Sequence, residues 1–136
     1  MIFLISCFLI NSLHASSAPD VLHYDLKISP DIDNAFITGE VVIDFKIEPG
    51  QQSVTFDKGA LEIMEVMGET LDSSGIAGNQ LILELKSGDN VVNHRVFIRY
   101  RGAPKRGLLF NQEKRQAYTV FFTSQWMVCN DDPADK

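Results

Sequence analysis

Histidines and cysteines are the residues of this sequence whose chemistry could support metal binding or nucleophilic catalysis. The chain has three histidines and two cysteines. His23 and His94 stand far apart among alternating polar and apolar residues, and neither belongs to an H-E-x-x-H motif. A zinc site needs three or four ligands at characteristic spacings. We therefore predict no catalytic residue and no metal site in this chain, and we interpret both histidines as strand residues.

Cys129 and the acids that follow it form a second candidate site. Asp131, Asp132 and Asp135 flank Pro133. Such a cluster could suggest a cation site, but closely spaced acids and a proline are also typical of a polar turn. No nucleophile motif such as G-x-S-x-G occurs in the sequence. We interpret the segment as a turn and leave the role of Cys129 open.

Basic residues concentrate in one stretch, since seven of the twelve lysines and arginines fall between Arg95 and Arg115. One interpretation is a basic hairpin that faces an acidic partner or another domain. The other is a solvated strand face and loop whose charges are balanced by acids elsewhere. The alternation of Arg95 and Arg99 with apolar residues favours the second interpretation, and both stay open.

The elements that must position these residues are predicted to be β-strands. Apolar and polar residues alternate through 21–28, where Leu22 and Tyr24 share a face, and again through 36–47. Gly39 suggests a bulge or bend in the second of these segments. Two glycines within 73–79 predict a loop there. Further strands are predicted at 54–56, 61–67, 81–85, 91–100, 107–110 and 117–122.

Seven or eight short strands with regular turns and no convincing helix set the fold class. They predict an all-β domain, an antiparallel β-sandwich or saddle of packed sheets. Hydrophobic residues make up 45% of the chain, which is enough to fill a core. The net charge of −6 disfavours non-specific binding to phosphates, so we expect no nucleic-acid partner.

The first ten residues form an apolar run, MIFLISCFLI, that small and polar residues follow. A membrane-spanning helix needs about 20 apolar residues, so the run predicts no membrane span. A short apolar stretch before a segment such as Ala15-Ser16-Ser17 is typical of a secretory signal peptide. We therefore predict a signal peptide at 1–18, a mature domain at 19–136, and export to the periplasm or outside the cell. Loss of Cys7 with the signal would leave Cys129 without an internal disulfide partner.

Several short motifs run through the mature chain in a fixed order. They are Tyr24-x-Leu26, Gly39, Tyr100-x-Gly102, Gly107-Leu108, Tyr118, Ser124-Gln125 and Cys129-x-Asp131-x-Pro133-x-x-Lys136. Their order and spacing resemble the N-terminal domain of the aminopeptidase N-like zinc metallopeptidases, the gluzincin aminopeptidases. The resemblance covers nearly all of the mature chain and rests on the series of motifs as a whole.

This resemblance implies a role and one site residue. In that family the opening β domain caps the catalytic domain and lines the pocket that receives the free amino end of a peptide substrate. The resemblance places Gln125 in that pocket, and the family's acid or amide anchor two residues later corresponds to Met127. The family's zinc motif lies in a later domain, so the resemblance implies zinc in the full-length relatives and none in this chain.

Two interpretations follow. The first is the non-catalytic N-terminal domain of an exported zinc metallo-aminopeptidase, incomplete here, which would reach its peptide substrate through a missing catalytic domain. A sheet that ends early would expose an unpaired edge. The alternative is a free-standing secreted β-sandwich that binds a protein or peptide through the basic hairpin or an open sheet edge. Fold class alone does not decide between them.

Overall fold

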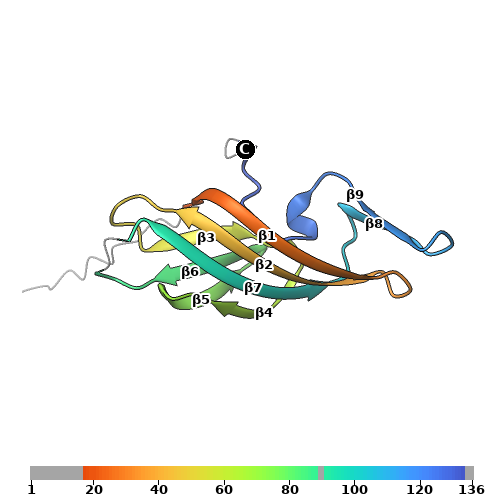
Figure 1. The fold of residues 1–136 in the computed structure, drawn as a ribbon, viewed down its shortest axis with the longest axis horizontal. Helices are drawn as coiled ribbons and strands as arrows, with labels where there is room; N and C mark the ends of the chain where they lie inside the picture. The colour runs from red at the N-terminus through yellow and green to blue at the C-terminus, as the bar shows by residue number, and fades with distance from the viewer. Residues whose placement is uncertain (1–16, 89–90, 134–136) are drawn as a thin grey trace, which may run out of the picture.

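The computed structural model describes residues 17–88 and 91–133, and most of the predicted signal peptide lies outside these residues. The described chain is built almost entirely of strands (Figure 1). They are β1 (Asp20–Asp31), β2 (Phe36–Lys46), β3 (Ser53–Asp57), β4 (Glu62–Met67), β5 (Leu71–Ala77), β6 (Gln80–Leu85), β7 (Asn93–Gly102), β8 (Leu108–Asn111) and β9 (Gln116–Thr119). A short 3-10 turn, η1 (Thr123–Gln125), follows β9. In the described part of the chain no helix is long and apolar enough to cross a membrane.

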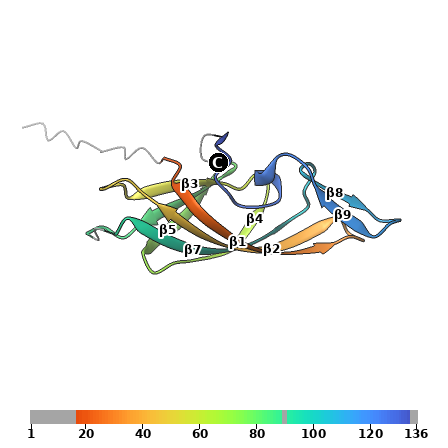
Figure 2. The same ribbon diagram turned by 45° about the horizontal axis from the view of Figure 1, so that its top comes forward.

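Two antiparallel sheets pack face to face, which confirms the predicted fold class. The larger sheet has the strand order β1-β2-β7-β4 and the smaller one has the order β3-β6-β5. β8 and β9 form a separate hairpin that extends beyond one end of the sandwich, beside the turn between β1 and β2 (Figure 2). The hairpin therefore stands apart from the main body of the fold.

The core fills the space between the two sheets. Alternate residues of β2 and β7 face alternate residues of β3 and β6, as the period of two requires. Phe45 on one sheet packs edge-to-face against Phe56 on the other, with ring centroids 5.4 Å apart. The buried residues on these four strands include Val41, Ile43, Phe45, Val54, Phe56, Leu81, Leu83, Ile98 and Tyr100.

β1 departs from simple alternation near its start. The sequence predicts Leu22 on the same inward face as Tyr24, but Leu22 is 50% exposed. The register between β1 and β2 shifts between Val21 and His23, and Val21 packs against the core instead. This irregularity turns the preceding side chains to the opposite faces, an outcome that alternation alone does not reveal.

Gly39 lies in an unbroken part of β2, so the predicted bulge at this position is wrong. It pairs with Ile28 on one side and with Tyr100 on the other without a register shift. A Cβ added at Gly39 would overlap the ring of Tyr100. Glycine is required here because the buried ring lies directly on the backbone of β2.

The loop predicted at 73–79 is also wrong, since most of it belongs to the edge strand β5. β5 pairs with β6 along its length, apart from one register shift between Leu71 and Ser73. Its side chains are mostly exposed, including Ile76 at 54%. Because main-chain hydrogen bonds hold this strand and its side chains bury little surface, it shows no apolar alternation. This additional strand explains why the described chain has nine.

His94 is a buried residue of β7. Its ring stacks on Phe45, with centroids 5.4 Å apart. The ring nitrogens contact the hydroxyl of Thr70 (Nδ1, 2.7 Å) and the carbonyl oxygen of Val91 (Nε2, 3.0 Å). A carbonyl oxygen can only accept, so Nε2 carries the proton. His23 is exposed on the outer face of the same sheet, so the sheet separates the two histidines.

Candidate interaction surface at the β8–β9 hairpin and Gln125

Gln125, the residue that the resemblance places in a substrate pocket, is half-buried at the end of η1. Its side chain lies over the turn between β3 and β4, where a Cβ added at Gly59 would come within 2.9 Å of Gln125 Nε2. The residue also borders a cavity of about 140 Å³ that Leu61, Pro104 and Lys105 help to line.

A cavity of this size has room for a few water molecules or a small polar group. The Gln125 amide at its border can both donate and accept hydrogen bonds. The amide therefore has a suitable chemistry and position for a polar ligand group, but a role for Gln125 in substrate binding stays a prediction.

The chain reaches η1 through an uncommon backbone conformation. Phe122 has φ 64° and ψ 60°, in the left-handed region that few non-glycine residues adopt. The carbonyl oxygens of Phe121 and Phe122 lie against Gly107, where a Cβ would come within 2.8 and 2.6 Å of them. Val120 also donates its N–H to the carbonyl oxygen of Gly107 at 2.8 Å. Close packing against Gly107 therefore sets the path of this segment.

After η1 the chain turns inward and pairs with the edge of β3. The N–H of Asp57 donates to the carbonyl oxygen of Cys129 at 2.7 Å, and the N–H of Cys129 donates back to the carbonyl oxygen of Asp57 at 3.0 Å. Met127, which the resemblance places at the family's anchor position, is only 8% exposed. Met127 is thus withdrawn from the surface, and of these two family positions it is Gln125 that a ligand could reach.

The acidic residues near the carboxyl end lie in a hydrogen-bonded turn. The N–H of Asn130 donates to the hydroxyl of Tyr24 at 2.8 Å, and that of Asp131 to the carboxylate at the end of β3 at 3.2 Å. Asp132 donates its N–H to the side chain of Asn130 at 3.2 Å, and Asp135 lies outside the described residues. These contacts favour the polar-turn interpretation. Within the described ranges, no three His, Cys, Asp or Glu side chains are placed to hold a metal ion.

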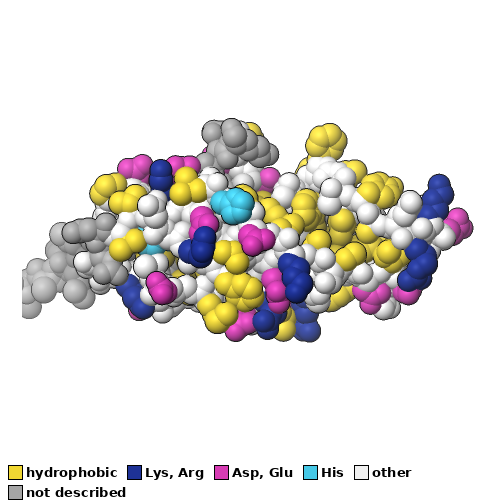
Figure 3. Space-filling model, in the orientation of Figure 1, with side chains coloured by type: hydrophobic (Ala, Val, Ile, Leu, Met, Phe, Trp, Pro, Cys, Tyr) yellow, Lys and Arg dark blue, Asp and Glu magenta, His cyan; other side chains and the backbone are white. Residues whose placement is uncertain are grey.

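Exposed apolar side chains gather on the β8–β9 hairpin and the segment that leads to η1. We call this group the aromatic platform; it consists of Leu109, Tyr118, Val120, Phe121 and Phe122. Phe121 is 84% exposed and Phe122 is 54% exposed. Figure 3 shows apolar side chains spread over this end of the molecule. The predicted strand at 117–122 ends at Thr119, and sequence reasoning missed that the apolar residues after it are exposed.

Three arginines of the basic stretch lie on the outer face of β7 and pair with acids of the neighbouring strands. Arg95 donates from Nε and Nη2 to the two carboxylate oxygens of Asp44, at 2.6 and 2.8 Å. These hydrogen bonds hold the pKa of Asp44 below its usual range. Each exposed pair contributes little stability by itself. The pairs are Arg95 with Asp44, Arg99 with Glu40 and Glu65, and Arg101 with Glu62.

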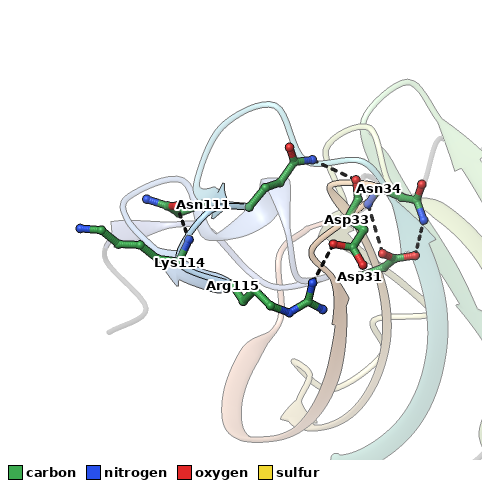
Figure 4. Close-up of polar contacts among 7 residues, drawn as sticks. Asp31, Asp33, Asn34, Asn111, Lys114 and Arg115 are labelled. Atoms are coloured by element: carbon green, nitrogen blue, oxygen red, sulfur yellow. Dashed lines mark hydrogen bonds and ion pairs between the residues drawn. The ribbon is translucent and has the colours of Figure 1, made fainter.

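Arg115 ties the hairpin to the turn between β1 and β2 (Figure 4). Its Nη1 donates to Asp33 Oδ1 at 2.9 Å, and Gln112 Nε2 donates to the carbonyl oxygen of Asp33 at 2.9 Å. The turn is itself fixed by Asn34, which donates its N–H and its side-chain amide to Asp31 at 3.1 and 2.8 Å. The same hydrogen bonds lower the pKa of Asp31.

The basic stretch therefore divides into two parts. Four of its five arginines, those at 95, 99, 101 and 115, are paired with acids of the same chain, as the balanced-surface interpretation expects. Lys105, Arg106 and Lys114 are exposed in or beside the hairpin. The guanidinium carbon of Arg106 lies 5.1 Å from the centre of the Phe122 ring, so this cation borders the aromatic platform. Of the basic stretch, these three residues best suit a partner-facing role.

No protein-family model matches the chain, and no curated protein sequence matches it. Solved structures share its fold. An M1 zinc metallopeptidase mutant from Deinococcus radiodurans, bound to a Tyr-Ser-Ala substrate, superposes with a TM-score of 0.71 at 18% identity. Another structure of an M1 zinc metallopeptidase from the same organism gives a TM-score of 0.65 at 20% identity.

These matches cover 87% of this chain and 30% of each metallopeptidase chain. The chain thus spans less than a third of the length of the structures it resembles. At such low identity the likeness establishes a common fold, that of a β domain within M1 zinc metallopeptidases. It does not by itself establish an activity.

Proposed function

We propose that this chain is the non-catalytic N-terminal β domain of an exported zinc metallo-aminopeptidase. The observation that carries the proposal is the match of 87% of this chain to a part of the M1 zinc metallopeptidase structures. The ordered motifs that end in Cys129-x-Asp131-x-Pro133 support the same assignment. In this proposal the zinc and the catalytic residues belong to a separate domain, which corresponds to a part of the metallopeptidase chains that this chain does not cover.

The aromatic platform is the surface that we assign to packing against the zinc-bearing domain. Phe121, at 84% exposed, is an unusual surface residue for an isolated domain, and its neighbour Phe122 is half exposed. Burial of aromatic side chains is a main source of stability at domain interfaces. Gln125 is three residues beyond Phe122, the last residue of the platform, so an adjoining domain would also approach the Gln125 amide.

In this arrangement Gln125 would line the pocket for the amino end of a peptide. Its amide oxygen can accept a hydrogen bond from an ammonium group, although it supplies no charge. The buried Met127 has no acceptor of comparable strength, so a carboxylate of the zinc-bearing domain would have to pair with the ammonium. Gln125 would therefore orient the substrate while the other domain provides most of the affinity.

Co-expression tests this proposal. The chain is produced together with the polypeptide encoded after Lys136, and the association, zinc content and hydrolysis of amino-acid p-nitroanilides are measured. We expect a zinc-containing complex that releases N-terminal residues. Replacing Phe121 and Phe122 by serine should weaken the association by at least about tenfold, since each buried aromatic ring contributes about 1.5–3 kcal/mol.

Ile76→Ser is the matched control, because Ile76 is a similarly exposed apolar residue on β5, outside the platform. It should leave the association unchanged. A downstream polypeptide that binds no zinc and does not associate would contradict the proposal. The free-standing secreted β-sandwich that binds a protein or peptide would then be the better account.

A further inference from the structure

The outer face of the four-stranded sheet carries a charge pattern that the proposed function does not use. Acids lie on β2 and arginines on β7, with one apolar residue between the two charges of each strand. Figure 3 shows this face, where basic and acidic side chains alternate around apolar ones. In register across the two strands, the pairs are Glu40 with Arg99, Val42 with Phe97, and Asp44 with Arg95.

The apolar row continues onto β4, where Met67 pairs with Phe97. On β1 the residue in register with Val42 is Asp25, and the nearest large apolar side chain is Leu22, closer to the start of that strand. Met67 and Leu22 are each 50% exposed. The face is hollowed over this row, with a volume of about 1000 Å³ bordered by Leu22, Val42, Met67 and Phe97 among others. The central residues Val42 and Phe97 are half-buried and Met67 is exposed. An apolar row of this kind between two charged rows is suited to a partner surface.

We propose that two copies of this chain pair through this face, about a two-fold axis that runs parallel to β2 and β7 and lies over the line between them. This axis lays β2 of each copy over β7 of the other. Asp44 then meets Arg95 of the second copy, and Glu40 meets Arg99 in the same way. An axis in the same plane but perpendicular to the strands would instead lay each strand over itself and bring Asp44 over Glu40.

The outer strands extend the same complementarity. Lys27 on β1 pairs in register with Glu40, and Glu65 on β4 pairs in register with Arg99, so these four residues form one row across the sheet. The proposed axis reverses the row in the second copy and therefore lays Lys27 over Glu65. Every charge of this row then meets an opposite charge of the other chain.

The apolar row fits the same arrangement. The large ring of Phe97 in one copy lies over the smaller Val42 of the other, so the ring enters the hollow above Val42. A contact made twice by the same surface is the usual form of a two-fold interface. Stacked sheets with the same twist pack with their strands within about 30° of each other, which this axis permits.

The charged rows of β2 and β7 are complementary to themselves, so they suit a second copy of this chain as the partner. Each carboxylate already contacts one arginine of its own chain, such as Asp44 with Arg95 at 2.6 Å, and the second copy would add another. Complementary charges favour one orientation of the dimer, whereas the apolar row excludes water at its centre. This face shares no residue with the aromatic platform, so dimerisation does not compete with the proposed packing of a zinc-bearing domain.

Charge reversals followed by mixing test the dimer. Sedimentation equilibrium of the full chain should show a monomer–dimer equilibrium. Asp44→Lys or Arg95→Glu should each weaken it by about tenfold or more, because like charges would then face each other across the axis. An equimolar mixture of the two variants should regain the dimer.

If the mixture regains the dimer, the restored contact lies between the two chains, because mixing does not restore any contact within either chain. In the mixed dimer the lysine introduced by Asp44→Lys faces the glutamate introduced by Arg95→Glu, and the unchanged Arg95 of the first chain faces the unchanged Asp44 of the second. Neither chain regains its internal ion pair. Circular dichroism and thermal unfolding of each variant check that it folds.

Glu62→Lys is the matched control. It breaks the pair between Glu62 and Arg101, which is of the same kind and lies on the same face. In register across the sheet, Glu62 shares a row with Thr38 and Ser29, so the proposed axis lays the uncharged Ser29 over it. Dimerisation should be unchanged. A chain that stays monomeric up to its solubility limit, charge reversals that still dimerise, or a mixture that stays monomeric would each overturn the proposal.

Discussion

At the scale of single residues, the close packing of Tyr100 restricts which side chains can stand at position 39. Tyr100 is fully buried with its ring on the backbone of Gly39. Burial raises the pKa of its hydroxyl, and the hydroxyl has no hydrogen-bond partner among the described residues. The ring therefore stabilises the sandwich by packing, and the residue beneath it must stay small.

Gly39→Ala should lower the free energy of unfolding by about 1–3 kcal/mol, because the added methyl group would overlap the Tyr100 ring. Urea unfolding followed by circular dichroism measures the change. Gly75→Ala on the edge strand β5 is the control, since a Cβ there meets nothing within 4 Å. Equal effects of the two substitutions would contradict the packing described here.

The Glu62–Arg101 pair should make stability depend on pH. Arg101 donates from Nε and Nη2 to the two carboxylate oxygens at 2.8 and 3.1 Å, and this lowers the pKa of Glu62. A lowered pKa in the folded state adds stability above the unfolded value of about 4.3, and the gain is lost as the pH falls through the folded pKa.

Glu62→Gln should therefore be less stable than the original chain near pH 7, and the difference should vanish at a pH well below the folded pKa. Urea midpoints at the two pH values measure it. Arg101→Gln removes the cause of the shift and should abolish the same pH-dependent gain. A difference that persists unchanged in acid would show that the substitution acts through something other than the ion pair.

The position and exposure of individual side chains were only partly predictable from the sequence. The alternation around His94 correctly indicated a strand residue, and the arginines that alternate with apolar residues are paired with acids. The exposure of Phe121 and Phe122 was not predictable, because consecutive apolar residues also occur in buried strands. The left-handed conformation at Phe122 accompanies close contact with Gly107, which is distant in the chain.

Among the strands and turns, η1 is held in place by the turn between β3 and β4. Gly59 has φ 51°, and a Cβ there would come within 2.7 Å of the carbonyl oxygen of Ser124. The turn and η1 thus fit together only if this residue has no side chain. Trp126 follows η1 directly and is the only tryptophan of the chain, so its fluorescence reports on this contact.

Gly59→Ala should shift the emission of Trp126 to longer wavelength and lower the thermal midpoint, since η1 must move away from the turn. Gly50→Ala is the matched control, because Gly50 also has a positive φ, at 84°, but a Cβ there meets nothing within 4 Å. The control should lower stability through backbone strain alone and leave the emission unchanged. Similar emission shifts in both variants would contradict the proposed contact.

The long strands were predictable because each buries one face, and the weak elements were not. β2 and β7 show clear alternation, whereas β5 is an edge strand whose side chains are mostly exposed. The irregularity near Val21 in β1 reversed the expected orientation of Leu22. Alternation of apolar and polar residues indicates that one face of a strand is buried. It therefore does not predict a strand that is held only by main-chain hydrogen bonds, nor an irregularity in pairing.

Across the whole molecule, two exposed surfaces lie on different parts of one sandwich. The aromatic platform lies at the hairpin, and the charged face lies on the four-stranded sheet. The net charge of −6 predicts neither surface, since one is apolar and the other carries acids and arginines side by side. The proposed function needs the first and the proposed dimer needs the second, so each can fail without the other.

The central claim is that this chain is the β domain of a zinc metallopeptidase. The most direct measurement is the sequence of the DNA that follows the codon for Lys136, read in all three frames. The claim predicts an H-E-x-x-H motif with a glutamate downstream, the ligand set of a zinc peptidase. Unrelated sequence in every frame would contradict the claim.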